Sequence, residues 1–242
     1  MGNFEKMKNR LFLCGDIHGE ISINRLSGKN WPEGRTLSKQ DYLIILGDFG
    51  LLWKMQPDRN EIYWLDWLHE RPWTTLFIPG NHENYFRLNK LESIEMFSSK
   101  VGKVNDSVFM LKRGEIYEIN DKAFFCMGGA KSIDKLQRRE FISWWPEEEP
   151  SQAECEKGIQ NLQEHKNKVD YILGHTSSTY AVRRLGEIVK QDFGNKQENL
   201  NKYFDVVCEK VEFKKFFFGH FHYDVEIDGK FCCLYKDIIE IE

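Results

Sequence analysis

The sequence predicts an α/β fold, and three of its features support this expectation. Short apolar runs alternate with longer segments in which apolar residues recur at helical spacing. The runs at 42–46 and 216–218 are continuously apolar, as expected for central strands covered on both faces. Asp228 and Gly229 stand between two short apolar runs and predict a hairpin turn.

Each predicted element follows from one of these patterns. Strands are expected at residues 10–14, 42–46, 75–78, 108–111, 116–119, 123–127, 171–173, 215–218, 225–227 and 231–235. Helices are expected at 59–70, 151–165, 178–190 and 198–209. Ser151 and Glu154 have the spacing of a capping box and mark the start of the second helix. The first helix is apolar around much of its circumference, so we expect neighbours to cover it on two sides.

Length and composition are those of an ordinary globular protein. The 242 residues, 41% of them hydrophobic, suffice for one well-buried core, so a single domain over 1–242 is expected. A net charge of -4 provides no overall positive field for nucleic acid or an anionic membrane. No run approaches the roughly 18 apolar residues of a membrane helix. With no signal-peptide pattern and six cysteines lacking a C-x-x-C pair, we expect a soluble, cytoplasmic protein.

Five apolar runs end in glycine, followed at once by residues that can bind a metal ion. The motifs GDIHG, GDFG, PGNHE, GHT and GHFH contain Asp16, His18, Asp48, Asn81, His82, His175, His220 and His222. Because strand ends converge at one edge of an open α/β sheet, these side chains can meet around a ligand. We expect the glycines to provide backbone angles closed to other residues. On extended backbone, both side chains of D-x-H and of H-x-H would point the same way.

The chemistry of this set is coherent. Neutral imidazole suits zinc, iron, manganese and nickel, Asp and Asn add oxygen ligands, and a carboxylate can bridge two ions. Two such ions with two carboxylates leave a positive charge of about two, which would attract phosphate. A single histidine in a turn is often a capping or hydrogen-bonding residue, so the prediction depends on all five motifs together. His69 and His165 lie within predicted helices and are interpreted as ordinary surface residues.

In this order the motifs resemble those of the calcineurin-like metallophosphoesterase superfamily, and the resemblance extends from Gly15 to His222. It implies a four-layer sandwich of two mixed β-sheets flanked by helices. It also implies two divalent ions, of Mn, Fe, Zn or Ni. The implied ligands are Asp16, His18 and His222 for one ion, Asn81, His175 and His220 for the other, and Asp48 as the bridge. His82 resembles the residue that steadies the phosphate and protonates the leaving oxygen.

The implied reaction is hydrolysis of a phosphomonoester or phosphodiester by a hydroxide bridging the metals. The motifs depart from those of Ser/Thr protein phosphatases, which have an Asp and an Arg where this chain has Leu51 and Leu52, so protein phosphatase activity is disfavoured. A nuclease would need a basic track that the net charge does not supply. A catalytically inactive scaffold is the other alternative, and the complete ligand set argues against it.

The segment at 128–151 is expected to form an insertion at the rim of the substrate site. Its candidate substrate-binding residues are Lys131, Lys135, Arg138, Arg139, Trp144 and Trp145. In one interpretation the basic side chains hold phosphate oxygens and an indole stacks on an aromatic group such as the base of a nucleotide. In the other, the tryptophans pack over the sheet and the charges face water. Residues 147–149 are interpreted as a solvated turn.

Overall fold

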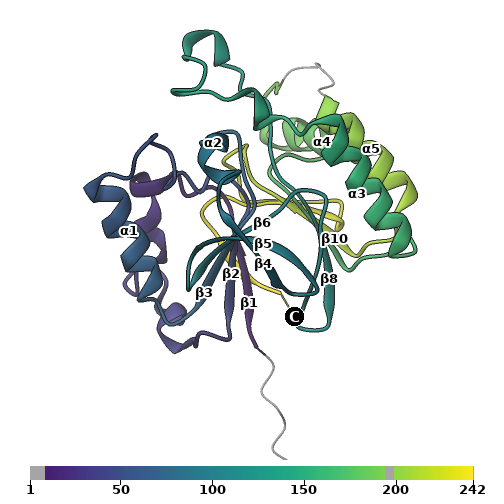
Figure 1. Ribbon diagram of the computed structural model, residues 1–242. Coiled ribbons are helices and arrows are strands. Elements are labelled where there is room, and N and C mark those ends of the chain that lie inside the picture. The colour runs from purple at the N-terminus through teal and green to yellow at the C-terminus, as the bar shows by residue number, and fades with distance from the viewer. Residues whose placement is uncertain (1–8, 194–198, 242) are drawn as a thin grey trace, which may run out of the picture.

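The computed structural model describes residues 9–193 and 199–241 and has two β-sheets stacked between layers of helices (Figure 1). The larger sheet contains, in spatial order, β13 (Ile238–Glu240), β1 (Leu11–Cys14), β2 (Tyr42–Ile45), β3 (Thr74–Phe77), β6 (Val108–Leu111), β5 (Ser99–Asn105) and β4 (Glu92–Met96). The smaller contains β11 (Val225–Ile227), β12 (Phe231–Cys233), β10 (Lys215–Phe218), β9 (Tyr171–Gly174), β8 (Lys122–Met127) and β7 (Ile116–Ile119). Both are mixed, with parallel central strands and antiparallel edges.

Helices cover the two outer faces. The larger sheet is covered by α1 (Arg59–His69) and the smaller by α3 (Gln152–Glu164), α4 (Thr179–Val189) and α5 (Asn199–Lys210) (Figure 1). One further turn, α2 (Tyr85–Leu88), follows the third motif. Short 3-10 helices are η1 (Gly19–Ile21), η2 (Ile23–Leu26), η3 (Pro32–Thr36), η4 (Lys135–Gln137) and η5 (Pro146–Glu148). The predicted four-layer sandwich is confirmed.

Alternation along the strands divides the apolar side chains among three cores. In β1, Leu11 and Leu13 enter the core between the sheets, whereas Phe12 enters the core on the α1 side. In β10, Phe217 faces the other sheet and Phe218 faces the helices of the smaller sheet. The apolar residues of β10 are therefore buried on both faces of the sheet, as the continuously apolar run at 216–218 predicted.

Most predicted elements are present within one or two residues of their expected bounds. The capping box of Ser151 and Glu154 is formed, and Asp228 lies in the turn between the antiparallel strands β11 and β12. Strands β4, β5 and β13 and helix α2 were not predicted. The expectation that α1 is covered on two sides is wrong, because Ile62 and Tyr63 are 50% and 59% exposed. The predicted start of the last helix, residue 198, lies outside the described residues.

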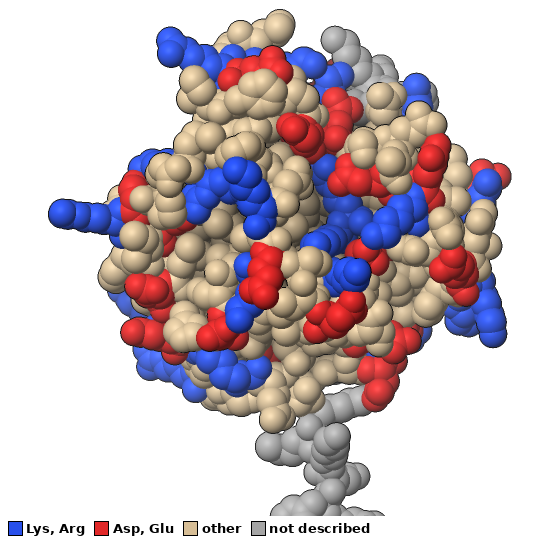
Figure 2. Space-filling model, in the orientation of Figure 1, with Lys and Arg blue, Asp and Glu red and all other residues tan. Residues whose placement is uncertain are grey.

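The distribution of surface charge, the state of the cysteines and the character of the helices can be compared with the expectations from composition. On the face shown in Figure 2, Lys and Arg are interspersed with Asp and Glu, without a large area of one sign. All six cysteines are free, and Cys14, Cys126, Cys232 and Cys233 are buried. Within 9–193 and 199–241, no helix combines the length and the apolar character needed to cross a membrane.

Candidate metal centre

Each of the five motifs follows a parallel strand, and the structure brings all five together. Asp16, Asp48 and Asn81 follow β1, β2 and β3, which are parallel neighbours in the larger sheet. His175 and His220 follow β9 and β10, which are parallel neighbours in the smaller sheet. Nδ1 of His175 lies 4.0 Å from Oδ1 of Asp16, so residues from both sheets share one site.

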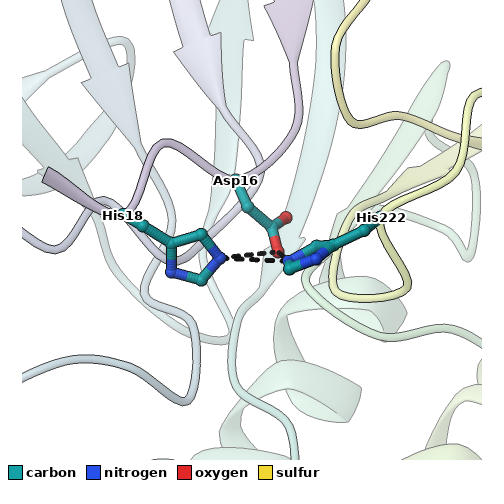
Figure 3. Close-up of side chains that lie close together, drawn as sticks. All are labelled: Asp16, His18 and His222. Carbon is teal, nitrogen blue, oxygen red and sulfur yellow. Dashed lines mark hydrogen bonds and ion pairs between the residues drawn. The ribbon is translucent and has the colours of Figure 1, made fainter. Parts of the chain in front are cut away.

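Asp16, His18 and His222 form the first group of possible ligands, and their side chains point toward one another (Figure 3). Oδ2 of Asp16 is 3.0 Å from Nε2 of His222 and 3.7 Å from Nε2 of His18. The ring of His222 lies flat on Tyr235, with ring centres 4.4 Å apart. Oδ2 of Asp16 is buried without a well-aligned hydrogen bond. A cation among these three side chains would satisfy that oxygen, so the group fits a metal ion.

Asp48 and His175, again with Asp16, form the second group. Nε2 of His175 lies 3.3 Å from Oδ1 of Asp48 and 3.0 Å from Oδ1 of Asn81. Nδ1 of the same ring faces the carbonyl oxygen of Leu46 at 2.8 Å. Such a backbone contact fixes the orientation of a metal-binding imidazole and leaves its other nitrogen directed at the ion.

Asp48 faces both groups. Its Oδ1 is 3.3 Å from His175, and its Oδ2 is 3.8 Å from Nδ1 of His18. The ring of His220 packs edge-on against that of His175, with centres 5.0 Å apart. This placement is compatible with a bridging carboxylate, while the assignment of each ligand to one ion stays a prediction.

Several ligand candidates have an uncommon backbone conformation. Positive φ angles are found at His18 (51°), Asp48 (47°), His220 (70°) and His222 (59°). Residues other than glycine rarely adopt this region, and those that do cluster at functional sites. The expectation of extended backbone in D-x-H and H-x-H is therefore wrong. Asp16 and His18 still share a group, but His222 joins them while His220 lies against His175.

The glycines that precede the ligands are required mainly for lack of space. Of the five, Gly47 alone has a positive φ, of 92°. A Cβ on Gly80 would collide with the backbone nitrogen and Oδ1 of Asp48, and a Cβ on Gly219 would collide with Oδ1 of Asp16. The expectation that these glycines provide special backbone angles is therefore confirmed at Gly47 only. At the other four positions, glycine is needed because a side chain would collide with neighbouring atoms.

The charges of the site influence one another strongly. Burial opposes ionisation of Asp16 and Asp48, but the surrounding histidines, His175 foremost, together outweigh it and hold the pKa of both carboxyls below the usual value. Burial alone would lower the pKa of His175, yet the two carboxylates raise it to about 9. Burial and the neighbouring His175 lower the pKa of His220 to about 4. Two buried carboxylates kept ionised are suited to bind cations.

His82 lies beside the ligand groups, next to a positive charge. Its backbone N–H donates to Oδ1 of Asp48 at 2.7 Å. The two terminal nitrogens of Arg138 lie 3.0 and 3.1 Å from the ring nitrogens of His82, and Arg138 also pairs with Asp134 at 2.8 Å. Burial lowers the pKa of His82, Asp48 opposes this, and Arg138 adds to it. The segment at 128–151 therefore brings a guanidinium to the predicted catalytic histidine.

A chain of buried hydrogen bonds orients Asn81. Its Nδ2 donates to Oγ of Ser132 at 3.0 Å, which directs Oδ1 toward His175. Ser132 in turn donates through Oγ and through its backbone N–H to the two carboxylate oxygens of Glu148, at 2.5 and 2.8 Å. Glu148 is 1% exposed, so the interpretation of 147–149 as a solvated turn is wrong for this residue.

Glu83, the last residue of the GNHE motif, connects two motifs. It is fully buried and accepts hydrogen bonds from the backbone N–H groups of Phe49, at 2.7 Å, and Gly50, at 3.3 Å. Burial and the nearby Asp48 raise its pKa to about 8. The carboxyl of Glu83 thus holds the loop after Asp48 in place.

The structure separates the candidate substrate residues of the 128–151 segment. Lys131 and Arg138 line a cavity of about 370 Å³ together with His82, Asn81 and Asp48. Elsewhere, Lys135 lies over the ring of Trp144 at 5.6 Å, and Arg139 is exposed. Trp145 is 1% exposed and packs in the core on the α1 side, edge-on to Trp53. The binding interpretation is wrong for Trp145, which offers no free face to a ligand.

Three residues around the site were not singled out from the sequence. Glu83 could have been found, because it belongs to the GNHE motif. Ser132 and Glu148 carried no such signal, since they are separated by 16 positions and meet only through the folding of the segment between them.

Comparison with known proteins agrees with this geometry. No significant match was found among curated proteins. The family described as calcineurin-like phosphoesterase matches residues 10–224, which include all five motifs and both ligand groups. The chain therefore belongs to the calcineurin-like phosphoesterase family.

Proposed function

We propose that the protein is a dinuclear metal-dependent phosphoesterase that hydrolyses a phosphomonoester or phosphodiester. The observation that carries this proposal is the arrangement of the two buried carboxylates. Asp16 belongs to both ligand groups, and Asp48, a member of the second group, also faces His18 of the first. Both carboxylates are buried, and burial of two like charges is costly unless cations neutralise them. When bound, two divalent ions would activate water as the nucleophile and neutralise charge on the phosphate.

The chain's own residues would position the phosphate. Leu51 and Leu52, in the second motif, are 5% and 4% exposed and contribute no charge. Arg138, from another segment, would supply the positive charge that the second motif lacks. It contacts His82, and the two side chains line the same cavity. A phosphate next to His82 would favour the protonated imidazole, which could then donate a proton to the leaving oxygen.

The alternatives are less well supported. On the face that Figure 2 shows, the mixed charges do not form the basic track of a nuclease. The buried Leu51 and Leu52 disfavour a protein phosphatase, and the assembled ligand groups disfavour an inactive scaffold. The free cysteines suit a reducing compartment, so we place the protein in the cytoplasm.

A hydrolysis panel tests the proposal. The full chain is incubated in turn with manganese, nickel, zinc and iron, and offered an aryl phosphate, a bis-aryl phosphate, cyclic nucleotides, dinucleotides and a phosphopeptide. We expect metal-dependent hydrolysis of at least one ester, and the panel separates monoester from diester preference. Absence of hydrolysis with every metal would overturn the enzyme function.

A further inference from the structure

A second cavity opens beside the candidate metal centre, and it is lined by His82 but not by Arg138. It has a volume of about 230 Å³, and its lining residues include His18 and His82. Trp53, Trp64, Leu51 and Ile21 are among its lining residues. The cavity thus adjoins the proposed catalytic site, and part of its wall is aromatic and aliphatic.

The size and walls of this cavity suit a flat ring. A cavity of about 150 Å³ is enough to bind benzene. Trp53 lies next to His82, with ring centres 6.1 Å apart, and both Trp53 and Trp64 are half-buried and keep part of their surface free. Ile21 is 82% exposed at the rim, although it is a large apolar residue. Exposed apolar surface beside a site is typical of ligand binding.

The charges around the cavity disfavour an anionic occupant. Glu20, Asp58 and Glu61 line it, together with a single lysine, Lys54. Lys54 pairs with Asp58, and Glu61 pairs with Arg87. Glu20 accepts a hydrogen bond from the uncharged side chain of Asn60. An uncharged group would enter this cavity more readily than a carboxylate or a second phosphate.

The two cavities share His82 but differ in the charge of their other lining residues. His82 lines both of them, while Arg138 and Lys131 line only the larger one. A phosphate held by the basic residues would therefore direct its ester group past His82 toward Trp53.

We propose that the cavity between Trp53 and Trp64 binds an uncharged aromatic group that is esterified to the phosphate. The proposal rests on the proposed phosphoesterase function and specifies the class of substrate: neutral aryl or similarly flat phosphate esters, in preference to small alkyl esters or esters that carry further negative charge. Trp64 and Ile21 act here as specificity-determining residues.

Binding of phosphonates, which are not hydrolysed, tests this preference. Dissociation constants of phenylphosphonate, methylphosphonate and 4-carboxyphenylphosphonate are measured by calorimetry on the full chain incubated with manganese. We expect phenylphosphonate to bind at least about tenfold more tightly than the other two. Loss of one aromatic contact changes affinity by up to about tenfold, so Trp64→Ala should reduce the preference for the phenyl over the methyl compound by about that factor.

Trp67→Ala is the matched control, because Trp67 lies on the same helix and packs on the same core but outside this cavity. It should keep the wild-type preference. If Trp64→Ala does not fold, Ile21→Ser gives a second test at an exposed rim position and should also reduce the preference.

Equal binding of phenyl- and methylphosphonate by the wild type, or equal effects of Trp64→Ala and Trp67→Ala, would overturn the assignment. If methyl phosphate is hydrolysed but no aryl preference is found, this inference alone fails. If no phosphonate binds and no phosphate ester is hydrolysed, the proposed function fails with it.

Discussion

At the scale of single residues, hydrogen bonds with neighbouring groups orient the candidate ligands of the site. His175 is fixed through its contact with Leu46, and Asn81 is fixed through Ser132. His82 differs, because its backbone N–H contacts Asp48 while its ring faces Arg138. Binding of metal and handling of the phosphate are therefore separable by mutation.

Replacement of His82 tests its role next to the metals. General acid catalysis typically contributes about 10²- to 10⁴-fold, so His82→Ala should slow hydrolysis by such a factor while metal content is unchanged. The rate is measured on an ester with a poor leaving group, where protonation matters most. His69→Ala, at the exposed end of α1, is the control. Full activity of His82→Ala on that ester would exclude the acid role.

Replacement of Arg138 tests whether it binds phosphate. Hydrogen bonds to charged groups contribute about 1.5–3 kcal/mol, so Arg138→Ala should lower kcat/KM roughly 10- to 100-fold. Arg139→Ala is the matched control, because the neighbouring side chain is exposed and is absent from the lining of the larger cavity. Similar losses in both variants would show that only the general positive charge of the segment matters.

At the scale of elements, the segment between β8 and α3 is held in place by two sets of buried hydrogen bonds, one of which reaches the candidate ligand Asn81. Ser132 and Glu148 meet beneath it, and Arg113 donates to the backbone carbonyl oxygens of Glu147 and Glu148, at 2.8 and 2.9 Å. The part between these points projects from the end of the molecule (Figure 1) and brings Arg138 to His82. Loss of this attachment should therefore change the positions of both Asn81 and Arg138.

Ser132→Ala tests this attachment. It removes the acceptor for Asn81 Nδ2 and one donor to the buried Glu148. Loss of a partner behind a metal ligand typically costs 10- to 100-fold in metal affinity or activity, and we expect roughly 10-fold weaker manganese binding by calorimetry. Ser98→Ala, at an exposed turn, should have no effect. Unchanged metal affinity in Ser132→Ala would contradict the positioning role.

Two of the strands that the sequence did not predict, β4 and β13, lie at the edges of the larger sheet. Strand β4 contains two glutamates and lies at the edge of its sheet, with mostly exposed or half-buried side chains, so it lacks a clear apolar alternation. Strand β13 forms the opposite edge and has only three residues. By contrast, β2 and β10 lie inside their sheets and were evident because both of their faces are apolar.

At the scale of the whole molecule, the candidate metal centre contains residues from both sheets. The ligand candidates follow three strands of one sheet and two of the other, and their order along the chain was enough to predict one shared site. The partners behind them, such as Glu148 for Asn81, depend on tertiary contacts and could not be predicted from spacing. Because ions would connect both sheets, their removal should weaken the entire fold.

Chelation measures this contribution. At a free ion concentration of 100 times Kd, binding to the folded state adds about 2.7 kcal/mol of stability, and 1 kcal/mol changes Tm by about 2–4 °C in a chain of this size. We expect a chelator to lower Tm by about 5–10 °C, as followed by circular dichroism. Manganese added in excess should restore Tm, and a Tm that is insensitive to both treatments would exclude a structural contribution from the ions.

The most direct test of the dinuclear centre is the number of metal ions bound per chain. Elemental analysis of the full chain, after incubation with manganese and removal of free ions, should give about two ions per chain. Asp48→Asn removes the carboxylate that faces both ligand groups and should reduce this number below one, whereas Asp66→Asn, on the exposed side of α1, should leave it at two. A wild-type protein that binds one ion or none would contradict the dinuclear site.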